Sequence, residues 1–255
     1  MMNQPKILMS ILGLAGFAFL LFGSIGAGST KPLVSPVFNY SPPEAPGTGS
    51  ANFTMALVSP SYKNLDEVGE PFNSFQKSLE AEIMEVMTAK GYSVRGPFES
   101  RDEMLYSDKE NSQLALIIEV EPEIQKATGS WTKVKMADNR MGYRFSRGTL
   151  NIYGKINLTA LEPISGEKMW AKSVNIPKQT TEEFTSSRVF VGSSLASDLQ
   201  AIAALAAAND ANVANPITKA LEKSFEDIMT KIWNHLDPTE FKRMVPKIKE
   251  LKAKG

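Results

Sequence analysis

Apolar residues occupy every second position in the stretch 52–59. Phe53, Met55 and Leu57 alternate there with polar or small residues. Successive side chains of an extended chain point to opposite faces, so a period of two predicts a β-strand with one buried face. We therefore expect the folded domain to begin near Ala51 and to open with a strand.

The spacing of apolar residues then changes to three or four, which is the period of an α-helix. The predicted helix begins behind Pro71 and ends before Gly91, since glycine readily takes the left-handed conformation of a helix C-cap. The chain then turns into a short strand at Tyr92–Val94. The apolar face of this helix consists of Phe72, Phe75, Leu79, Ile83, Val86 and Met87.

Three longer strands are predicted in the middle of the chain. Residues 114–120 are apolar on both faces, as expected for a strand at the centre of a sheet. Residues 150–158 alternate in polarity, and the turn sequence at 162–166 leads into a strand at 168–176, which predicts an antiparallel hairpin. Ser100–Glu103 has the capping-box pattern of a short helix.

The C-terminal part of the chain predicts helices. Apolar residues at helical spacing within the alanine-rich stretch 194–209 predict the first of them. Asn215 and Pro216 suit the N-cap and first turn of a second helix, whose apolar stripe must cover the sheet. A third helix begins near Asp237, and Pro246 predicts a kink in it.

The order of these elements predicts an α+β fold. We expect a single envelope domain over residues 51–255, with a partly antiparallel sheet, helices packed on one face of the sheet, and long C-terminal helices. A chain of 255 residues that is 42% hydrophobic can bury one core of ordinary size.

The N-terminal region has the features of an export signal. Ile7–Gly28 follows Lys6, contains no charged residue and ends in small residues. This run also has the length of a membrane span, which takes ~20 apolar residues, so residues 1–28 are either a signal peptide or a membrane anchor. Residues 29–50 are rich in proline, glycine and serine and predict an extended tether. Both alternatives imply an exported protein.

Composition narrows the chemistry. Basic and acidic residues number 28 each, so no overall positive charge favours nucleic acid as a partner. There is no cysteine to form a disulfide, act as a thiolate or carry a lipid. His235 is the single histidine, so histidine metal sites and Ser-His-Asp triads lack their groups. We predict a protein that is not an enzyme and needs no cofactor or metal; paired carboxylates remain the catalytic alternative.

Four stretches carry a resemblance to a known family: Asn39–Pro42, Gly91–Val94, Leu161–Glu167 and the helix pattern from Ala220 to Ile232. They resemble the neuraminyllactose-binding hemagglutinins, surface lipoproteins of gastric and enteric spiral bacteria that are sometimes described as flagellar-sheath adhesins. The turn and the helix are the more specific stretches. The resemblance implies an adhesin of the outer membrane or flagellar sheath that binds sialylated glycans.

The sequence departs from this family in two places. The family's lipobox cysteine would fall near Ser24, where no diacylglyceryl thioether can form. The basic segment proposed for sialic acid binding in the family corresponds here only to Ile124–Lys126. Three acidic residues precede it on the same stretch: Glu119, Glu121 and Glu123.

A basic stretch continues from Lys126 to Arg147. It holds six basic residues and three aromatic ones against the single acid Asp138. Basic side chains can pair with a sialyl carboxylate, and an aromatic ring can pack on the apolar side of a sugar. The alternative is a solvated loop whose aromatic residues cover the core. The candidate ligand-binding residues are Gln125, Lys126, Trp131, Lys133, Lys135 and Arg140.

We therefore expect a cell-envelope binding protein whose partner is a host glycan. The alternative is a periplasmic scaffold that docks on another envelope protein. Membrane association would come from residues 1–28. The alanine-rich helix leaves three alternatives open: packing on the domain, pairing with a second subunit in a homo-oligomer, or contact with a membrane.

Overall fold

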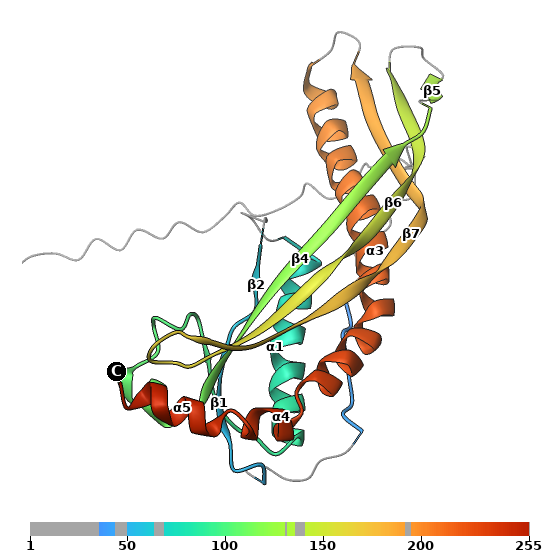
Figure 1. Ribbon diagram of the computed structural model, residues 1–255. Helices are drawn as coiled ribbons and strands as arrows, with labels where there is room; N and C mark the ends of the chain where they lie inside the picture. Colours follow the sequence, from blue (N-terminus) through green and yellow to red (C-terminus); the bar gives the residue numbers. More distant parts are fainter. Residues whose placement is uncertain are drawn as a thin grey trace, which may run out of the picture. The chain divides into compact units, whose positions relative to one another are not determined.

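The computed structural model describes residues 36–43, 50–63, 69–130, 132–135, 141–191 and 195–254. The predicted export signal and the start of the predicted tether lie outside these residues. The strands are β1 (Thr54–Val58), β2 (Ser61–Tyr62), β3 (Ser93–Phe98), β4 (Leu114–Thr128), β5 (Thr132–Lys135), β6 (Met141–Leu161) and β7 (Lys168–Val191) (Figure 1). The helices are α1 (Phe72–Ala89), α2 (Tyr106–Asn111), α3 (Leu195–His235), α4 (Pro238–Lys242) and α5 (Val245–Lys252).

The strands in the described part of the chain form one seven-stranded sheet. β1 lies between β3 and β4 and runs parallel to both, and β2 also runs parallel to β4. In contrast, β4, β5 and β7 all run antiparallel to β6. The predicted α+β fold with a partly antiparallel sheet is therefore confirmed.

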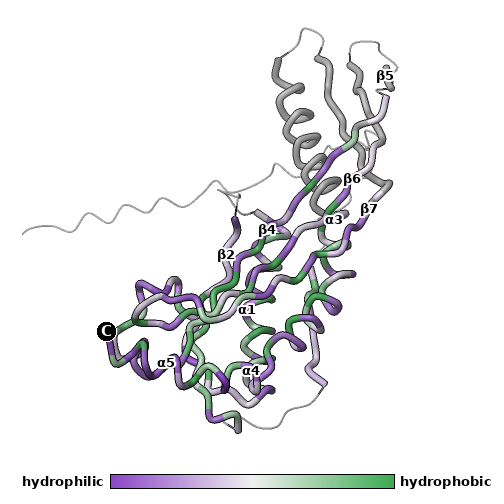
Figure 2. The backbone as a smooth tube through the Cα atoms, in the orientation of Figure 1, coloured by the Kyte–Doolittle hydropathy of each residue, from purple (hydrophilic) through white to green (hydrophobic). Residues whose placement is uncertain are grey.

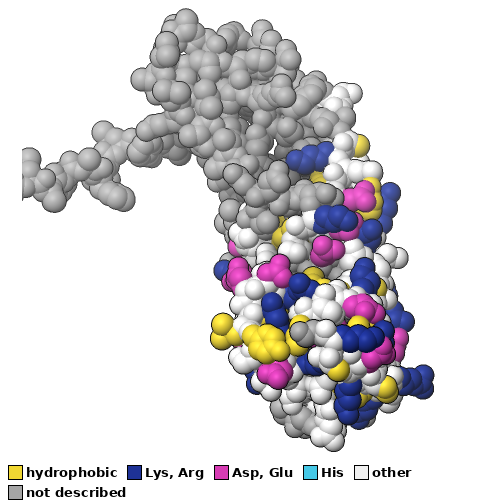
Figure 3. Space-filling model, turned by 60° about the vertical axis from the view of Figure 1, so that its left-hand side comes forward, with side chains coloured by type: hydrophobic (Ala, Val, Ile, Leu, Met, Phe, Trp, Pro, Cys, Tyr) yellow, Lys and Arg dark blue, Asp and Glu magenta, His cyan; other side chains and the backbone are white. Residues whose placement is uncertain are grey.

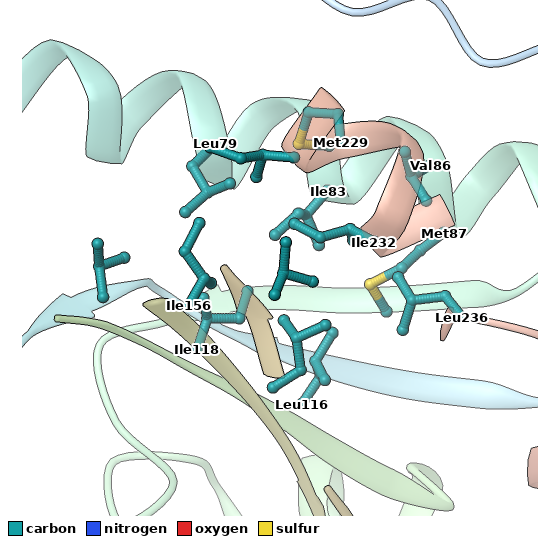
Figure 4. Close-up of a cluster of buried hydrophobic side chains, with 14 of the residues drawn as sticks. Leu79, Ile83, Val86, Met87, Leu116, Ile118, Ile156, Met229, Ile232 and Leu236 are labelled. Carbon is teal, nitrogen blue, oxygen red and sulfur yellow. The ribbon is translucent and has the colours of Figure 1, made fainter. Parts of the chain in front are cut away.

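The long helices α1 and α3 cover one face of this sheet (Figure 1). Along β4, the side chains of Leu116, Ile118 and Val120 point to this face and are buried. Figure 4 shows Leu116 and Ile118 beside Ile156 of β6, below side chains from both helices. The apolar stripe predicted for α1 is confirmed, because five of its residues are buried here: Phe75, Leu79, Ile83, Val86 and Met87.

The opposite face of the sheet has a small apolar cluster near the start of β4. Ala56 of β1 and Ala115 of β4 pack there against Met104 and the half-buried Phe98. Met104 directly follows Ser100–Glu103, the stretch whose capping-box pattern predicted a short helix. That stretch forms a turn, in which Ser100 Oγ accepts the Glu103 N–H at 3.3 Å, and α2 begins only afterwards. One capping bond fixes a turn, but it does not nucleate a helix without further favourable contacts.

The C-terminal helix boundaries also differ from the prediction. α3 is one helix with Pro216 inside it, where the sequence predicted the start of a second helix. An interior proline removes a backbone hydrogen bond and costs ~3 kcal/mol. Packing of α3 along β7, with Ile217 and Leu221 buried directly after the proline, offsets this cost. The predicted third helix is interrupted before Pro246, where a kink was expected: α4 ends at Lys242, and Pro246 lies in the first turn of α5, where a proline needs no hydrogen-bond partner.

The predicted hairpin is confirmed, and its strands are longer than predicted. β6 and β7 pair from Leu161 opposite Lys168 to Met141 opposite Val191. The basic stretch 126–147 is largely strand, because it contains the end of β4, all of β5 and the start of β6. The alternation of apolar residues reports burial on one face, so it could not reveal strand pairing beyond the core.

A segment of the predicted tether lies in the core. Phe38 is only 4% exposed, and its ring packs against those of Phe75 in α1 and Phe225 in α3. The backbone N–H of Val37 donates to Glu222 Oε1 at 2.8 Å. The segment around Phe38 is therefore docked on both long helices, a role that one isolated phenylalanine could not indicate in the sequence.

Candidate functional site

The sheet face opposite α1 and α3 is polar beyond its small apolar cluster. Figure 2 shows hydrophilic and hydrophobic positions alternating along β4 and β6. Directly opposed residues of antiparallel strands point to the same face, so the register defines this surface. On β4 it presents Glu119, Glu121, Glu123 and Gln125, opposite Asn157, Lys155, Tyr153 and Asn151 of β6.

Glu121 lies at the centre of a network on this face. Its carboxylate oxygens lie 3.1 Å from Lys63 Nζ and 3.2 Å from Lys155 Nζ. Asn157 Nδ2 donates to Glu121 Oε1 at 2.8 Å, and Ser173 Oγ donates to Asn157 Oδ1 at 3.1 Å. The hydrogen bond from Lys63, followed by the other contacts, lowers the pKa of the Glu121 carboxyl. These side chains bind one another, so this part of the face has few groups left for a ligand.

Tyr153 lies further along the same face, beside two residues of β4. The interaction of its hydroxyl with Glu123 is the main cause that raises the pKa of Tyr153. Glu123 stands directly opposite Tyr153 in the register, and Gln125 is its diagonal neighbour. The ring of Tyr153 is therefore an aromatic contact surface on the open face, with polar neighbours on β4.

The regular pairing of β6 and β7 is interrupted next to Tyr153. Gly154 pairs with Ile176, but Ile152 pairs with Gln179, so β7 carries one extra residue. Such a β-bulge redirects side chains. An open hollow of about 550 Å³ lies at this position. It is lined by Gln125, Tyr153, Gly154, Asn175, Ile176, Pro177 and Lys178.

Gly154 is required by the close approach of two strands. Its φ angle of +152° is one that other residues rarely adopt. A Cβ atom at this position would overlap the carbonyl oxygen of Glu121 and touch Pro122 Cα of β4. The missing side chain thus lets β4 and β6 pass closely beside the hollow.

Asn175 and Lys178 supply the free functional groups of the hollow. Both are exposed, and neither side chain has a hydrogen bond or ion pair within the described residues. An amide can donate and accept hydrogen bonds, and an ammonium group can donate three. Together with the ring of Tyr153, these groups can hold a polar ligand, but they include no activated nucleophile.

The described residues contain no group of three or more metal-binding side chains. His235 lies at the end of α3, where burial, followed by the nearby Lys172, lowers the pKa of its imidazole. The imidazole therefore stays neutral at neutral pH. It does not line the hollow.

The structure separates the predicted ligand-binding residues. Gln125 lies on the open face and lines the hollow. Lys126 is the next residue of β4, stands opposite Leu150 and therefore points to the other face. Lys133 and Lys135 belong to β5, where they pair with Arg144 and Gly142 of β6. Trp131 and Arg140 lie outside the described residues.

Tyr153, Asn175 and Lys178 were not predicted as site residues from the sequence. Each looks like an ordinary polar position of an amphipathic strand, and only the register brings them together. Two signals point to the irregular spot, namely Gly154 and Pro177 within strands. Both residue types mark bulges or close backbone approaches when they interrupt a strand.

Charge does not distinguish this site from the remaining surface. The sequence has as many acidic as basic residues. Figure 3 shows blue and magenta side chains interspersed over the described part of one side of the molecule. A ligand would therefore be recognised by local groups and not by long-range attraction.

Comparison with known proteins identifies one family. Residues 29–255 match the family model described as neuraminyllactose-binding hemagglutinin precursor. A search of the curated proteins gave no significant match.

Several solved structures are similar to this chain at low sequence identity. A neuraminyllactose-binding hemagglutinin homologue from Helicobacter pylori is 18% identical, with a TM-score of 0.45, over 77% of this chain and 99% of that one. A lipoprotein from Neisseria meningitidis is 13% identical, with a TM-score of 0.27, over 64% and 99% of the two chains. The PelC dodecamer from Paraburkholderia phytofirmans is 12% identical, with a TM-score of 0.25, over 72% and 94%. The family match is the finding on which the assignment rests.

Proposed function

Because the chain belongs to the neuraminyllactose-binding hemagglutinin family, we propose that it is a non-enzymatic binding protein of the bacterial cell envelope and acts as an adhesin. Its ligand is a glycan of the host surface, and the family description suggests a sialylated one. The outer membrane and the flagellar sheath are the locations that suit this function.

The open face of the sheet carries this proposal. It presents an aromatic ring, together with an amide and an ammonium group that are free within the described residues, around one hollow. Glycan sites combine such aromatic surfaces with a few polar groups that fix the orientation of the sugar. The groups that line the hollow suit binding, because they can orient a sugar by hydrogen bonds and by contact with its apolar side.

Export and attachment complete the proposal. We propose that residues 1–28 direct the chain to the envelope, either as a signal peptide or as an anchor, and that residues 29–50 lead into the domain. Within the described residues, no helix is long and apolar enough to span the bilayer. Since no cysteine is present, the mature protein should carry no diacylglyceryl group. Its intact mass, compared with that of the unmodified chain, tests this point.

Attachment of whole cells tests the adhesin function. Cells that produce the protein should bind sialylated surfaces better than cells that lack it, and sialidase treatment of the surface should reduce the difference. Protease added to intact cells should also cleave the domain. If protease cleaves the domain only after the outer membrane is opened, the domain is not at the surface and the adhesin function is ruled out.

A periplasmic scaffold is the second candidate, because an apolar pair is exposed at α2. Leu105 and Tyr106 are 69% and 65% exposed, although both are large hydrophobic residues. Exposed apolar groups of this kind often contact another protein. Protection of the domain in intact cells, with loss of a cross-linked envelope partner in the Leu105→Ser variant, would favour the scaffold over the adhesin.

A further inference from the structure

We propose that the hollow beside Tyr153 is a subsite for a single pyranose ring, which it recognises by the apolar side and the hydroxyl groups of the ring and not by a charge. This proposal rests on the proposed function, because it assumes that the ligand is a glycan. It adds the location of the subsite and the feature of the sugar that the site detects.

The dimensions and the walls of the hollow suit a sugar ring. Its volume of about 550 Å³ lies within the range of ordinary small-ligand pockets, which is roughly 300–1,000 Å³. The ring of Tyr153 and the half-buried Pro177 form an apolar wall. One side of a pyranose exposes mainly C–H groups, which pack favourably on such surfaces.

The hydrogen-bonding groups are arranged around this apolar wall. Gln125 approaches from β4, while Asn175 approaches from β7 on the other side of β6. Gln125 is exposed on the open face, and the Asn175 amide is free within the described residues. Each amide can donate to one sugar hydroxyl and accept from another, so a ring between them would be held from two sides.

The charges near the hollow nearly compensate one another. Lys178 is the one charged residue among the described residues that line it. Glu123 lies on the opposite side, directly across from Tyr153 in the register of β4 and β6. A carboxylate on the sugar would be attracted by the first group and repelled by the second. Exposed ion pairs contribute little, so we expect a charge preference of about fivefold at most.

Binding of two defined sugars to the purified chain tests the subsite. Lactose and neuraminyllactose share a neutral disaccharide and differ by one acidic sugar. Titration calorimetry or NMR should give dissociation constants for the two sugars that differ by about fivefold or less. The difference should vanish at high salt, because screening removes the contribution of Lys178.

Four variants and a matched control locate the subsite. Tyr153→Ala and Asn175→Ala should weaken the binding of both sugars tenfold or more. Lys178→Ala should weaken only the binding of neuraminyllactose. Ser173→Ala is the control, since Ser173 is exposed on the same strand but does not line the hollow. Tyr153→Phe keeps the ring and loses only the hydroxyl, so its affinity for both sugars should lie between those of the parent and Tyr153→Ala. It serves as the test of the ring if the alanine variant unfolds.

The outcomes separate this proposal from the proposed function. If neuraminyllactose binds and lactose does not, or if the Tyr153, Asn175 and Lys178 variants bind like the parent, the subsite assignment is wrong even when cells adhere. If the sugars bind in the hollow and the cells do not adhere, the subsite stands and the adhesin function fails.

Discussion

Phe38 stacks edge to face on Phe75, with 5.4 Å between ring centroids and an angle of 89° between the ring planes. One of these residues comes from a segment rich in proline and glycine, and the other from the buried stripe of α1. The contact makes the start of the described chain part of the domain core.

Replacing Phe38 by alanine should lower the free energy of unfolding by ~3–5 kcal/mol, because it leaves a cavity between two helices. Urea unfolding followed by circular dichroism measures the change. The control is Val37→Ala, since Val37 is 62% exposed and its loss should change stability by less than ~0.5 kcal/mol. Equal effects of both variants would show that the segment is not docked in solution.

Lys252 ties α5 to the end of α2. Its ammonium group donates to the backbone carbonyls of Lys109, Glu110 and Ser112, at 3.1, 2.5 and 2.7 Å. Lys252→Met should lower the free energy of unfolding by ~1–3 kcal/mol, because half-buried carbonyls lose a charged donor. Lys254→Met is the comparison, as it removes only an exposed ion pair. Thermal unfolding that is equal for the two variants would refute this assignment.

Glu82 should make stability depend on pH. Burial is the main cause that raises the pKa of its carboxyl, and a hydrogen bond from the backbone of Tyr40 opposes the shift. A pKa that is higher in the folded than in the unfolded chain means that the folded state binds the proton more tightly. The stability contributed by this group is therefore present at low pH and lost as the pH rises through the folded pKa.

The variant Glu82→Gln imitates the neutral carboxyl and should be more stable than the parent at neutral pH. The gain should shrink as the pH falls to about 4, where the parent carboxyl is itself protonated. Urea unfolding at a series of pH values gives the comparison. Glu226→Gln, at an exposed position of α3, should show no such trend. The prediction is contradicted if the free energies of unfolding of the parent and of Glu82→Gln change in the same way with pH.

Gly154→Ala should destabilise the sheet by ~2 kcal/mol or more, because its backbone angle disfavours alanine and a methyl group would overlap β4. The matched change is Gly69→Ala, where a Cβ meets nothing within 4 Å. The loss should appear in thermal unfolding of Gly154→Ala alone. Equal melting temperatures would mean that β4 and β6 are further apart than the structure indicates.

Helices and strands whose apolar residues recur at a regular spacing were predicted well from the sequence. The stripe of α1 from Phe75 to Met87, the central strand at Leu116 and Ile118, and the hairpin around Leu158 all follow from the burial of one face. What the period could not show is pairing outside the core, such as the full length of β7. The spacing of apolar residues also could not show that packing keeps α3 continuous through Pro216.

The candidate site was predictable only in part. Gln125 was selected from the sequence, and it lines the hollow, but its neighbour Lys126 points to the other face. Tyr153 and Asn175 became visible only through the register of β4, β6 and β7. A site built across three strands depends on which residues stand opposite each other, and a linear sequence does not contain that information directly.

The two pairing modes that meet at β4 have a consequence for the order of folding. β6 and β7 follow each other in the chain and can zip together by local contacts, which form quickly. The parallel pair of Met55 with Leu114 encloses α1, β3 and α2, so joining β1 to β4 closes a long loop and carries a larger entropic cost. β4 is thus the strand at which a hairpin formed by local contacts meets strands that pair over a long sequence separation. A chain in which β1 has not yet paired exposes the edge of β4 and the apolar face of the hairpin to other chains, which favours aggregation.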